Sequence, residues 1–370
     1  EAVLKREIYD LGYDIEKVTD GRVEFIGDEE AVARANIFLR TAERILIKCA
    51  DFTAESFEEL YQGIKAVHWE ERIPKNGRFW VTKASSVRSK LFSPSDIQSI
   101  VKKAMVDEMA EHYGVNVFPE DGEDYPLRIF ILKDEVTAGL DTTGMSLHKR
   151  GYRTMQGEAP IAENLAAGLI MLTPWKDGRI LADPFAGSGT IPIEAALMAA
   201  NIAPGMHRGF TAQKWESIPA SLWSDAVEEA GDLIKPPLKD TVIDALDIDG
   251  KLLEVARANA KRAGVDKYIR FCEGDAGRFV HDGSYGFIIT NPPYGERLED
   301  KNSLPKIYSS FGAALKKLDN WSLYMITSYE ACEKQLGLKA AKKRKIYNGM
   351  IKTDFYQFPG KKPVRERSNQ

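Results

Sequence analysis

The 370-residue chain is long enough for two or three domains, and its hydrophobic content of 44% is ordinary for a globular protein. No apolar run approaches the ~20 residues that a membrane-spanning helix needs, so we expect no association with a membrane. The formal net charge of −4 argues against a uniformly basic nucleic-acid coat, which leaves local basic patches as the candidate contacts.

The three cysteines, Cys49, Cys272 and Cys332, lie far apart, and no CxxC pair is present. This spacing supports neither a disulfide framework nor a zinc site, and we expect no bound metal. Free cysteines usually behave as small buried hydrophobic residues. The pattern is typical of a protein in the reducing cytoplasm.

The first 150 residues alternate short strands and helices. Asp28 precedes apolar residues at helical spacing and is expected to cap that helix, and Ser95 or Asp96 is expected to cap a later one. The elements do not form a repeated βαβ unit, so an α+β region is predicted. The predicted strands are 23–26, 44–50, 79–82, 127–132 and 136–140, and the predicted helices are 29–39, 56–66 and 95–109.

The pattern changes near residue 150. A strongly apolar helix is predicted over 162–172, and strand-like segments follow it, most of them separated by helical stretches. Asn348-Gly349 is a strong signal for a two-residue hairpin. Parallel strands with helical crossovers, closed by an antiparallel hairpin, predict a doubly wound α/β sheet. The predicted strands are 180–183, 241–247, 269–273, 285–290, 321–327, 345–347 and 351–358.

Segment 201–237 interrupts this rhythm between the first two strands of the sheet. It contains His207, Arg208, Trp215 and Trp223, with prolines near both ends. It is long for a crossover between neighbouring strands. We therefore expect an insertion that packs over the site or toward the substrate.

The run Asp183-Pro-Phe-Ala-Gly-Ser-Gly-Thr190 predicts a glycine turn that leaves a strand and opens a helix. Glycines at 187 and 189 let the backbone pass close to a ligand that a Cβ would obstruct. The following helix points its N-terminus at that ligand. The run lacks both the Gly-Lys-Ser/Thr ending of a P-loop and the full GxGxxG spacing of a dinucleotide site. A site for another nucleoside-bearing cofactor is predicted.

Acidic residues end the next two strands. A carboxylate at Asp247 can accept hydrogen bonds from both ribose hydroxyls, and Asp249 is the competing candidate because it could equally cap the next helix. Asp275 could accept a hydrogen bond from an adenine amino group. Alternatively, Asp275 holds only its own turn.

Asn291-Pro292-Pro293-Tyr294 follows the strand at 285–290. The Asn291 Oδ1 and the Pro292 carbonyl can each accept one N–H of an exocyclic base amine, and the two prolines stiffen the loop. Tyr294 offers a ring on which an extruded base can stack. The alternative is an ordinary Asn-Pro turn at a strand end. Because the tetrapeptide lies downstream of the glycine turn in the sequence, the two motifs together favour methyl transfer to a base amine.

Residues 151–370 resemble the class I methyltransferases that modify amino groups. The run 146–153, the sequence Ala159-Pro160-Ile161 and the insertion residues 202–205 and 214–215 resemble THUMP-domain RNA methyltransferases. The nearest group is the bacterial enzymes that make N2-methylguanosine in 23S ribosomal RNA. Many members of that group carry the older description of N6-adenine-specific DNA methylases.

The resemblance implies a ferredoxin-like segment at 1–50, a THUMP domain at 51–150 that grips RNA, and an S-adenosylmethionine-dependent methyltransferase domain at 151–370. It also implies that Ala159, Pro160 and the start of the next helix touch the cofactor. The full set of cofactor candidates is Ala159, Pro160, Asn164, Asp183, Phe185, Ala186, Gly187, Ser188, Gly189, Thr190, Asp247, Ile248, Asp275, Ala276 and Asn291.

Basic clusters supply the RNA-contact candidates, although each cluster alone is more often a solvated face. The main candidates are His148, Lys149, Arg150, Arg153, Lys83 and Arg88, with Lys90, Lys102 and Lys103 as further ones. Two other basic clusters are Lys339 with 342–345, and 361–362 with Arg365 and Arg367.

Guanine-N2 methylation of 23S ribosomal RNA is the leading prediction. Guanine N2 in transfer RNA and adenine N6 in DNA are the enzymatic alternatives, because the NPPY tetrapeptide suits either amine. The N-terminal α+β region favours RNA, since a DNA enzyme more often carries a target-recognition domain. A noncatalytic RNA-binding assembly factor is the alternative from another class. The chain keeps the residues expected of an active enzyme, which argues against it: Asp183, Gly187, Gly189, Asp247, Asp275 and Asn291.

Overall fold

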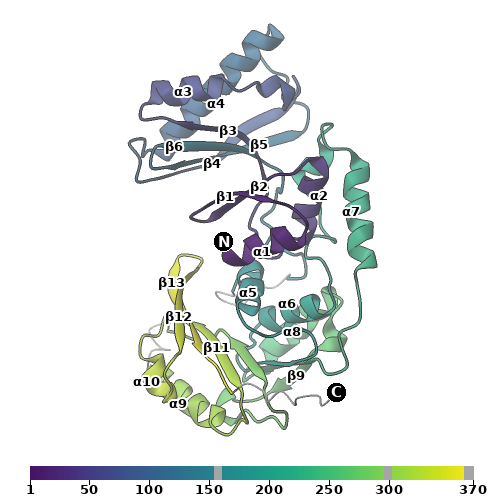
Figure 1. Cartoon of the computed structure of the whole chain (residues 1–370), viewed down its shortest axis with the longest axis vertical. Helices are drawn as coiled ribbons and strands as arrows, with labels where there is room; N and C mark the ends of the chain where they lie inside the picture. The colour runs from purple at the N-terminus through teal and green to yellow at the C-terminus, as the bar shows by residue number, and fades with distance from the viewer. Residues whose placement is uncertain (154–160, 296–301, 362–370) are drawn as a thin grey trace, which may run out of the picture.

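The computed structural model describes residues 1–153, 161–295 and 302–361. The molecule is elongated, with two N-terminal units stacked above a larger C-terminal domain (Figure 1). Its strands form a two-stranded, a four-stranded and a seven-stranded sheet. No helix in the described ranges is both long and apolar enough to cross a membrane.

The first unit packs two helices against an antiparallel pair of strands. The Asp28 side chain accepts a hydrogen bond from the Ala31 backbone at 3.1 Å, so the predicted N-cap is confirmed. Two alanines and an isoleucine in the helix that follows are fully buried, which anchors this small unit. Its elements are α1 (Ala2–Asp10), β1 (Ile15–Thr19), β2 (Arg22–Phe25) and α2 (Glu29–Phe38).

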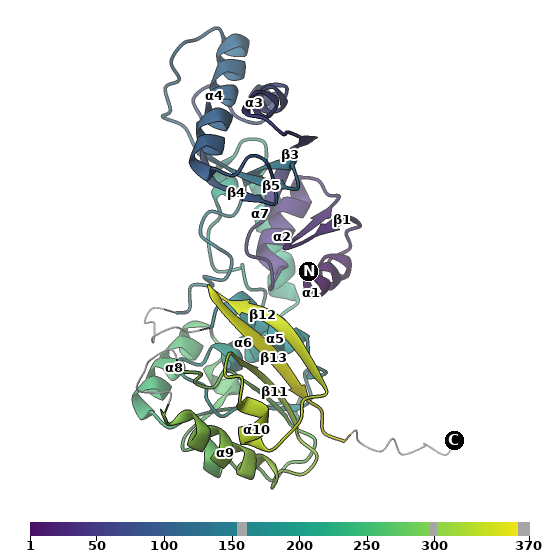
Figure 2. The same ribbon diagram turned by 90° about the vertical axis from the view of Figure 1, so that its left-hand side faces the viewer.

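The second unit is a four-stranded sheet in the order β3-β6-β5-β4, with α3 and α4 packed together on one face (Figure 2). Its elements are β3 (Leu46–Thr53), α3 (Phe57–Lys65), β4 (Arg78–Val87), α4 (Pro94–Tyr113), β5 (Asp124–Leu132) and β6 (Glu135–Asp141). The sequence boundary after residue 50 falls inside β3, which pairs with β6. We therefore propose that this unit begins near residue 46.

The C-terminal domain is a seven-stranded mixed sheet in the order β12-β13-β11-β10-β7-β8-β9. Five strands are parallel, and β12 and β13 form the predicted antiparallel hairpin. Helices cover both faces, so the predicted α/β fold class is confirmed. The elements are α5 (Glu163–Met171), β7 (Ile180–Asp183), α6 (Thr190–Ala199), α7 (Ala220–Asp232), β8 (Val242–Asp247), α8 (Gly250–Arg262), β9 (Arg270–Glu273), β10 (Phe287–Thr290), α9 (Leu304–Leu315), β11 (Ser322–Thr327), α10 (Cys332–Leu336), β12 (Lys342–Asn348) and β13 (Ile351–Phe358).

The insertion at 201–237 packs against the N-terminal units, so the expectation that it packs over the site is wrong, and packing toward the substrate stays a prediction. Its helix α7 runs along α2 (Figure 1). Trp215 stacks on Tyr125 with ring centroids 4.9 Å apart, and Trp223 belongs to the same N-terminal core. Burying these two large aromatic side chains is favourable only where an apolar partner surface exists. A fragment beginning at residue 151 would expose both tryptophans.

Buried charges join the first unit to the C-terminal domain. Arg150 lies 3.6 Å from the fully buried Glu194 of α6, and its guanidinium also donates to the Arg40 carbonyl. Arg40 in turn donates to the Ile202 carbonyl at 2.7 Å, while its backbone N–H donates to Glu7 at 2.7 Å. Removing one member of such a network leaves an uncompensated buried charge. The two parts of the chain are therefore fixed against one another.

Gly205 tests this docking of the insertion. Its N–H donates to the Ile37 carbonyl at 2.9 Å, and a Cβ there would lie 2.5 Å from the Asn36 carbonyl oxygen. We predict that Gly205→Ala lowers the free energy of unfolding by about 1–3 kcal/mol, because the crowded atoms are backbone. Thermal denaturation followed by circular dichroism measures the effect.

Gly231→Ala is the matched control. Gly231 lies in α7, and a Cβ there meets nothing within 4 Å. Because alanine favours helix more than glycine does, this variant should melt at or above the wild-type temperature. Equal melting temperatures for the Gly205 variant and wild type would contradict tight docking.

Candidate active site

The two sequence motifs meet at one edge of the seven-stranded sheet. β7 and β10 are parallel neighbours, and they end at Asp183 and Thr290. The Thr290 hydroxyl donates to Asp183 Oδ1 at 2.6 Å, and the Phe185 N–H donates to the same oxygen at 3.1 Å. The glycine turn and the NPPY loop thus begin side by side, at the carboxyl edge where open α/β sheets bind ligands.

The two glycines of the turn have different roles. Gly187 has a φ of 53°, donates its N–H to Asp247 Oδ2 at 2.8 Å, and would point a Cβ into open space. Gly189 has a φ of 84°, and its Cβ would lie 2.9 Å from the Ala256 Cβ of α8. Gly189 therefore allows α6 and α8 to pack closely, whereas Gly187 leaves an open cradle beside the turn. Such a cradle fits a ligand that passes close to the backbone.

The acidic residues after β8 and β9 mainly shape their own loops. Asp247 uses its second oxygen to accept from the Asp249 N–H at 3.0 Å. Asp249 caps α8 through the Lys251 N–H, which is the alternative role considered for it. Asp275 accepts from the Gly277 N–H at 2.8 Å, so it holds its own turn. Ile248 is 71% exposed beside Asp247 and presents an apolar surface at this edge.

The NPPY loop is held from two sides. The Tyr308 hydroxyl donates to the Pro293 carbonyl at 3.1 Å and lies 2.8 Å from the Thr327 hydroxyl. Asn348, at the end of β12, donates its side-chain amide to the Tyr294 hydroxyl at 3.0 Å. Contacts from α9 and β12 therefore fix the loop before any substrate arrives.

Asn291 has a buried side-chain oxygen, Oδ1, that the described residues leave without a hydrogen bond. Leaving a buried acceptor unpaired costs about 1–3 kcal/mol. Such an atom at the end of β10, beside the glycine turn, fits an N–H supplied by a ligand.

Asp183 has unusual electrostatics. Burial raises the pKa of its carboxyl to about 7, and the nearby Asp247 adds to the shift, while the hydrogen bonds from Thr290 and Phe185 oppose it. The carboxyl is only 2% exposed, so removal from water dominates. Perturbed carboxyl groups of this kind gather at functional sites.

The remaining predicted cofactor residues differ in position and exposure. Ala159 and Pro160 lie outside the described residues. The Asn164 amide on α5 donates to Glu43 of the first unit at 3.0 Å. Ala186, Ser188, Thr190 and Ala276 are buried.

Sequence reasoning missed Glu163, which lies next to this edge. It is 3% exposed and lies 3.5 Å from Arg153, which donates to the Thr190 hydroxyl at 2.6 Å. The available signal was a carboxylate in an otherwise apolar helix, because a buried charge needs a partner. Glu163 and Arg153 together support the start of α6.

The basic run before residue 153 needs correction as an RNA surface. Arg150 and Arg153 are buried against Glu194 and Glu163, so their charges are used inside the protein. His148 lies 3.0 Å from a Glu43 carboxylate oxygen. Among the main candidates, Lys149, Lys83 and Arg88 are exposed, and the further candidates Lys90 and Lys103 are exposed as well.

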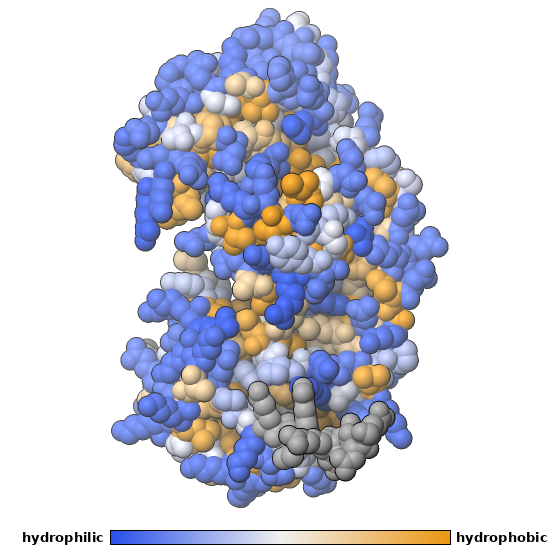
Figure 3. Space-filling model, in the orientation of Figure 1, coloured by the Kyte–Doolittle hydropathy of each residue, from blue (hydrophilic) through white to orange (hydrophobic). Residues whose placement is uncertain are grey.

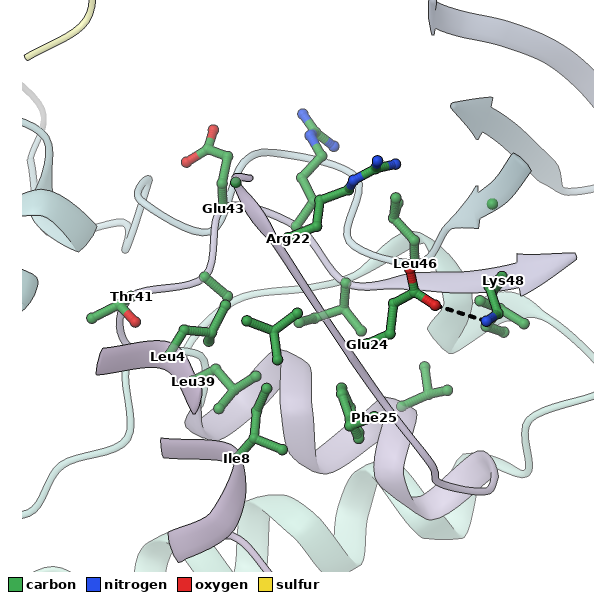
Figure 4. Close-up of a pocket in the computed structure, with 18 of the residues that line it drawn as sticks. Leu4, Ile8, Arg22, Glu24, Phe25, Leu39, Thr41, Glu43, Leu46 and Lys48 are labelled. Atoms are coloured by element: carbon green, nitrogen blue, oxygen red, sulfur yellow. Dashed lines mark hydrogen bonds and ion pairs between the residues drawn. The ribbon is translucent and has the colours of Figure 1, made fainter. Parts of the chain in front are cut away.

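A cavity of about 1210 Å³ lies elsewhere, between the first unit and α5. Figure 4 shows its apolar side chains Leu4, Ile8, Phe25 and Leu39, with the Glu24–Lys48 ion pair at one side. The tip of the β12–β13 hairpin also borders it. Its lining includes no residue of the glycine turn and no residue of the NPPY loop, so we do not assign the cofactor to this cavity.

One group of possible metal ligands occurs among the described residues, in the second unit rather than at the sheet edge. Ligand atoms of His68, Glu70 and Glu108 lie within 4.8 Å of one another. Burial, followed by the hydrogen bond and charge of Glu70, raises the pKa of Glu108 to about 7. We assign no metal to this group.

Comparison with known proteins decides the family. The protein family described as "RMKL-like, methyltransferase domain" matches residues 150–357, which is more than half of the chain. The chain belongs to this family of S-adenosylmethionine-dependent methyltransferases. An RlmL ferredoxin-like domain matches residues 1–46 and a THUMP domain matches 54–141. The resemblance seen in the sequence is confirmed.

Full-length relatives share the whole architecture. The chain is 46% identical over 374 residues to the Bacillus subtilis protein named "Putative RNA methyltransferase YpsC", covering 100% of this chain and 96% of the relative. A possible methylase from Clostridium difficile superposes with a TM-score of 0.94 at 51% identity, covering 99% and 97% of the two chains. SMU.472, a "putative methyltransferase complexed with SAH", superposes with a TM-score of 0.90 at 39% identity, covering 98% and 96%.

Asp183→Asn tests the buried carboxyl, because asparagine keeps the acceptor oxygen and cannot ionise. The raised pKa means that the folded protein keeps a proton that the unfolded chain has lost, so the carboxyl's favourable contribution falls as pH rises from about 4 toward 7. The cofactor-free variant should gain stability relative to wild type from pH 5 to pH 7, by at most about 1.4 kcal/mol per pH unit. A difference in melting temperature that is independent of pH would contradict the assignment.

Gly187→Ala tests the cradle. We predict weaker S-adenosylhomocysteine binding by isothermal titration calorimetry, because the added methyl group enters the open space beside the turn. Gly12→Ala is the matched control, since Gly12 has a φ of 94°, an open surrounding and a position between α1 and β1 in the first unit. If both variants lower the melting temperature alike and neither weakens binding, no ligand occupies the cradle.

Proposed function

We propose that the protein methylates an exocyclic base amine in RNA, namely N2 of a guanine in 23S ribosomal RNA. The observation that carries the proposal is the buried Asn291 Oδ1, which has no partner among the described residues and lies at the end of β10. A base amine supplies the N–H donor that this acceptor lacks. The Thr290–Asp183 contact brings the acceptor next to the glycine turn.

The chemistry needs a nitrogen whose lone pair is delocalised into an aromatic ring to attack carbon. S-adenosylmethionine supplies an electrophilic methyl group on sulfur. Asn291 Oδ1 and the Pro292 carbonyl accept the two amine N–H groups and stabilise the positive charge that develops on nitrogen. Tyr294 stacks against the base and holds the amine in line. The N–C bond forms as the C–S bond breaks, and the surplus proton then leaves to water.

The cofactor side uses the residues around the same edge. In this proposal the cofactor passes beside Gly187 at the N-terminus of α6, and Asp247 accepts hydrogen bonds from the ribose hydroxyls. Each Asp247 oxygen accepts one backbone N–H and keeps a second lone pair for the ribose. Asp275 accepts from the adenine amino group, and Ile248 covers one face of the ring.

RNA is favoured over DNA by the N-terminal units. The match to a THUMP domain at 54–141 and the name of the Bacillus subtilis relative both support an RNA substrate. We call Asn291 Oδ1 and the Pro292 carbonyl the clamp. The clamp can bind a guanine or an adenine amine, because an amide oxygen and a carbonyl offer the same acceptors to both. The substrate experiment must therefore distinguish methylation of guanine N2 in RNA from methylation of adenine N6 in DNA.

Asn291→Ala should lower kcat by about 10²–10³-fold while the affinity for S-adenosylhomocysteine changes little, because the missing acceptor acts on the transition state. Transfer of radiolabelled methyl groups to ribosomal RNA from a deletion strain measures kcat, and calorimetry measures binding. Asn116→Ala, at an exposed position in the second unit, should behave as wild type. Near wild-type transfer by the Asn291 variant would refute the clamp.

Mass mapping of modified nucleosides in the deletion strain identifies the substrate. Loss of an N2-methylguanosine from 23S ribosomal RNA, restored by the wild-type gene and not by the Asn291 variant, is the expected result. Loss from transfer RNA alone, or of N6-methyladenine from DNA, would replace the proposed substrate.

A further inference from the structure

The β12–β13 hairpin presents a second basic surface that the reaction does not explain. β12 is the edge strand of the sheet, and it carries four consecutive basic residues at 342–345. Lys352 lies across the hairpin on β13. Lysines on an edge strand are often a defence against aggregation. That defence does not require Tyr347 and Met350, which are 61% and 97% exposed near the hairpin tip.

Three of these side chains share one face. Tyr347 pairs directly with Lys352, and Lys345 lies two residues before Tyr347 on β12. Side chains that pair across a hairpin, or that lie two positions apart, point to the same side. We call Lys345, Tyr347 and Lys352 the hairpin face. It alternates cation, ring and cation, the pattern that phosphates and bases of a single strand require.

The charges of the hairpin face are available. In the described ranges, neither Lys345 nor Lys352 has a carboxylate within salt-bridge distance, although Asp354 pairs with Lys345 across the ladder. By contrast, Lys343 is occupied, because it pairs with Glu333 and lies over the Tyr356 ring. Asp354 points to the same side as Lys345, so this side of the hairpin carries one carboxylate beside the two lysines.

The hairpin also reaches the NPPY loop. Asn348 ends β12, is only 9% exposed, and donates to the Tyr294 hydroxyl at 3.0 Å. Tyr347 and Gly349, on either side of it, border the cavity between the first unit and α5. The space-filling view is hollowed at this height, on the side where the hairpin rises (Figure 3). Because Tyr347 and Asn348 are adjacent on β12, the hairpin face and the Asn348 contact lie on opposite sides of the hairpin, so an RNA strand on the hairpin face would reach the NPPY loop around the hairpin tip.

We propose that the hairpin face binds the single-stranded RNA that flanks the target nucleotide and that Asn348 positions Tyr294. The two lysines contact backbone phosphates, and the Tyr347 ring stacks on a base next to the extruded one. Asn348 keeps the Tyr294 ring at a fixed angle to the incoming base. The inference rests on the proposed RNA substrate and identifies the second surface that holds it.

Binding measured without cofactor tests the hairpin face. The probe is a fluorescein-labelled, unstructured 12-nucleotide RNA, and anisotropy titrations at several salt concentrations give the affinity. Lys345→Ala with Lys352→Ala should weaken binding and reduce the slope of log affinity against log salt by about 1.4, or about 0.7 for each phosphate that is no longer neutralised. Tyr347→Ala should weaken binding severalfold without changing the slope.

The matched control removes two exposed lysines from α9 and its end, as Lys316→Ala with Lys317→Ala. This variant removes the same charge and should keep the wild-type slope. Equal slopes for the hairpin variant and wild type, or an equal weakening in both double variants, would overturn the proposal. Because binding is read without methyl transfer, the result stands even if wild type methylates no RNA, which would instead refute the proposed function.

A double-mutant cycle tests Asn348 as a positioning residue. Asn348→Ala and Tyr294→Phe should each lower kcat with little change in S-adenosylhomocysteine affinity, and Asn348→Ala should have no further effect in the Tyr294→Phe background. Asn348→Asp should recover activity, because its carboxylate can accept a hydrogen bond from the Tyr294 hydroxyl. Additive effects in the double variant would show that Asn348 acts on the hairpin turn instead, and would overturn this role.

Discussion

The hydrogen bond from the Thr290 hydroxyl to the buried Asp183 carboxyl joins the two halves of the candidate active site. It spans 107 residues of sequence and connects the ends of β7 and β10. The cofactor turn begins on one side of this bond and the NPPY loop on the other. Without it, the two parallel strands would still pair, but the direct side-chain link between their ends would be lost. Because the bond is buried, it is also stronger than a similar bond at the surface.

That edge depends in turn on supports from outside the sheet. Arg153 and Glu163 hold the start of α6 through Thr190, and Tyr308 holds the NPPY loop through Pro293. The N-terminal units are fixed to the same domain by the insertion and by the buried charges around Arg150. The N-terminal units and the sheet edge are therefore held in a fixed relation, which is what the proposed positioning of an RNA substrate requires.

Much of this can be predicted from sequence, because the informative signals are local. The strand ends, the glycine turn and the NPPY tetrapeptide are contiguous, and the rule for parallel sheets brings them to one edge. The Asn348-Gly349 hairpin is equally local. What these patterns cannot give are partners distant in the chain. Nothing near Arg150 indicates that Glu194 neutralises it, so a basic run in the sequence predicts a surface that the fold instead buries.

The insertion shows the same limit in another form. Its tryptophans predict burial, since large apolar rings need a partner surface, but they do not say which surface. The packing partner Tyr125 comes from β5 of the second unit, and no local period connects the two. Similarly, the contact between Asn348 and Tyr294 joins a hairpin end to a loop 54 residues earlier. Only the tertiary fold reveals that the end of the hairpin contacts the NPPY loop.

The most direct measurement of the central claim is a crystal structure of the protein with S-adenosylhomocysteine bound. The account predicts the ribose hydroxyls at Asp247 and the sulfur between the glycine turn and Asn291, with Asn291 Oδ1 facing the space left for a base amine. Cofactor density in the cavity between the first unit and α5, with the β7 and β10 loops unchanged and empty, would contradict the account.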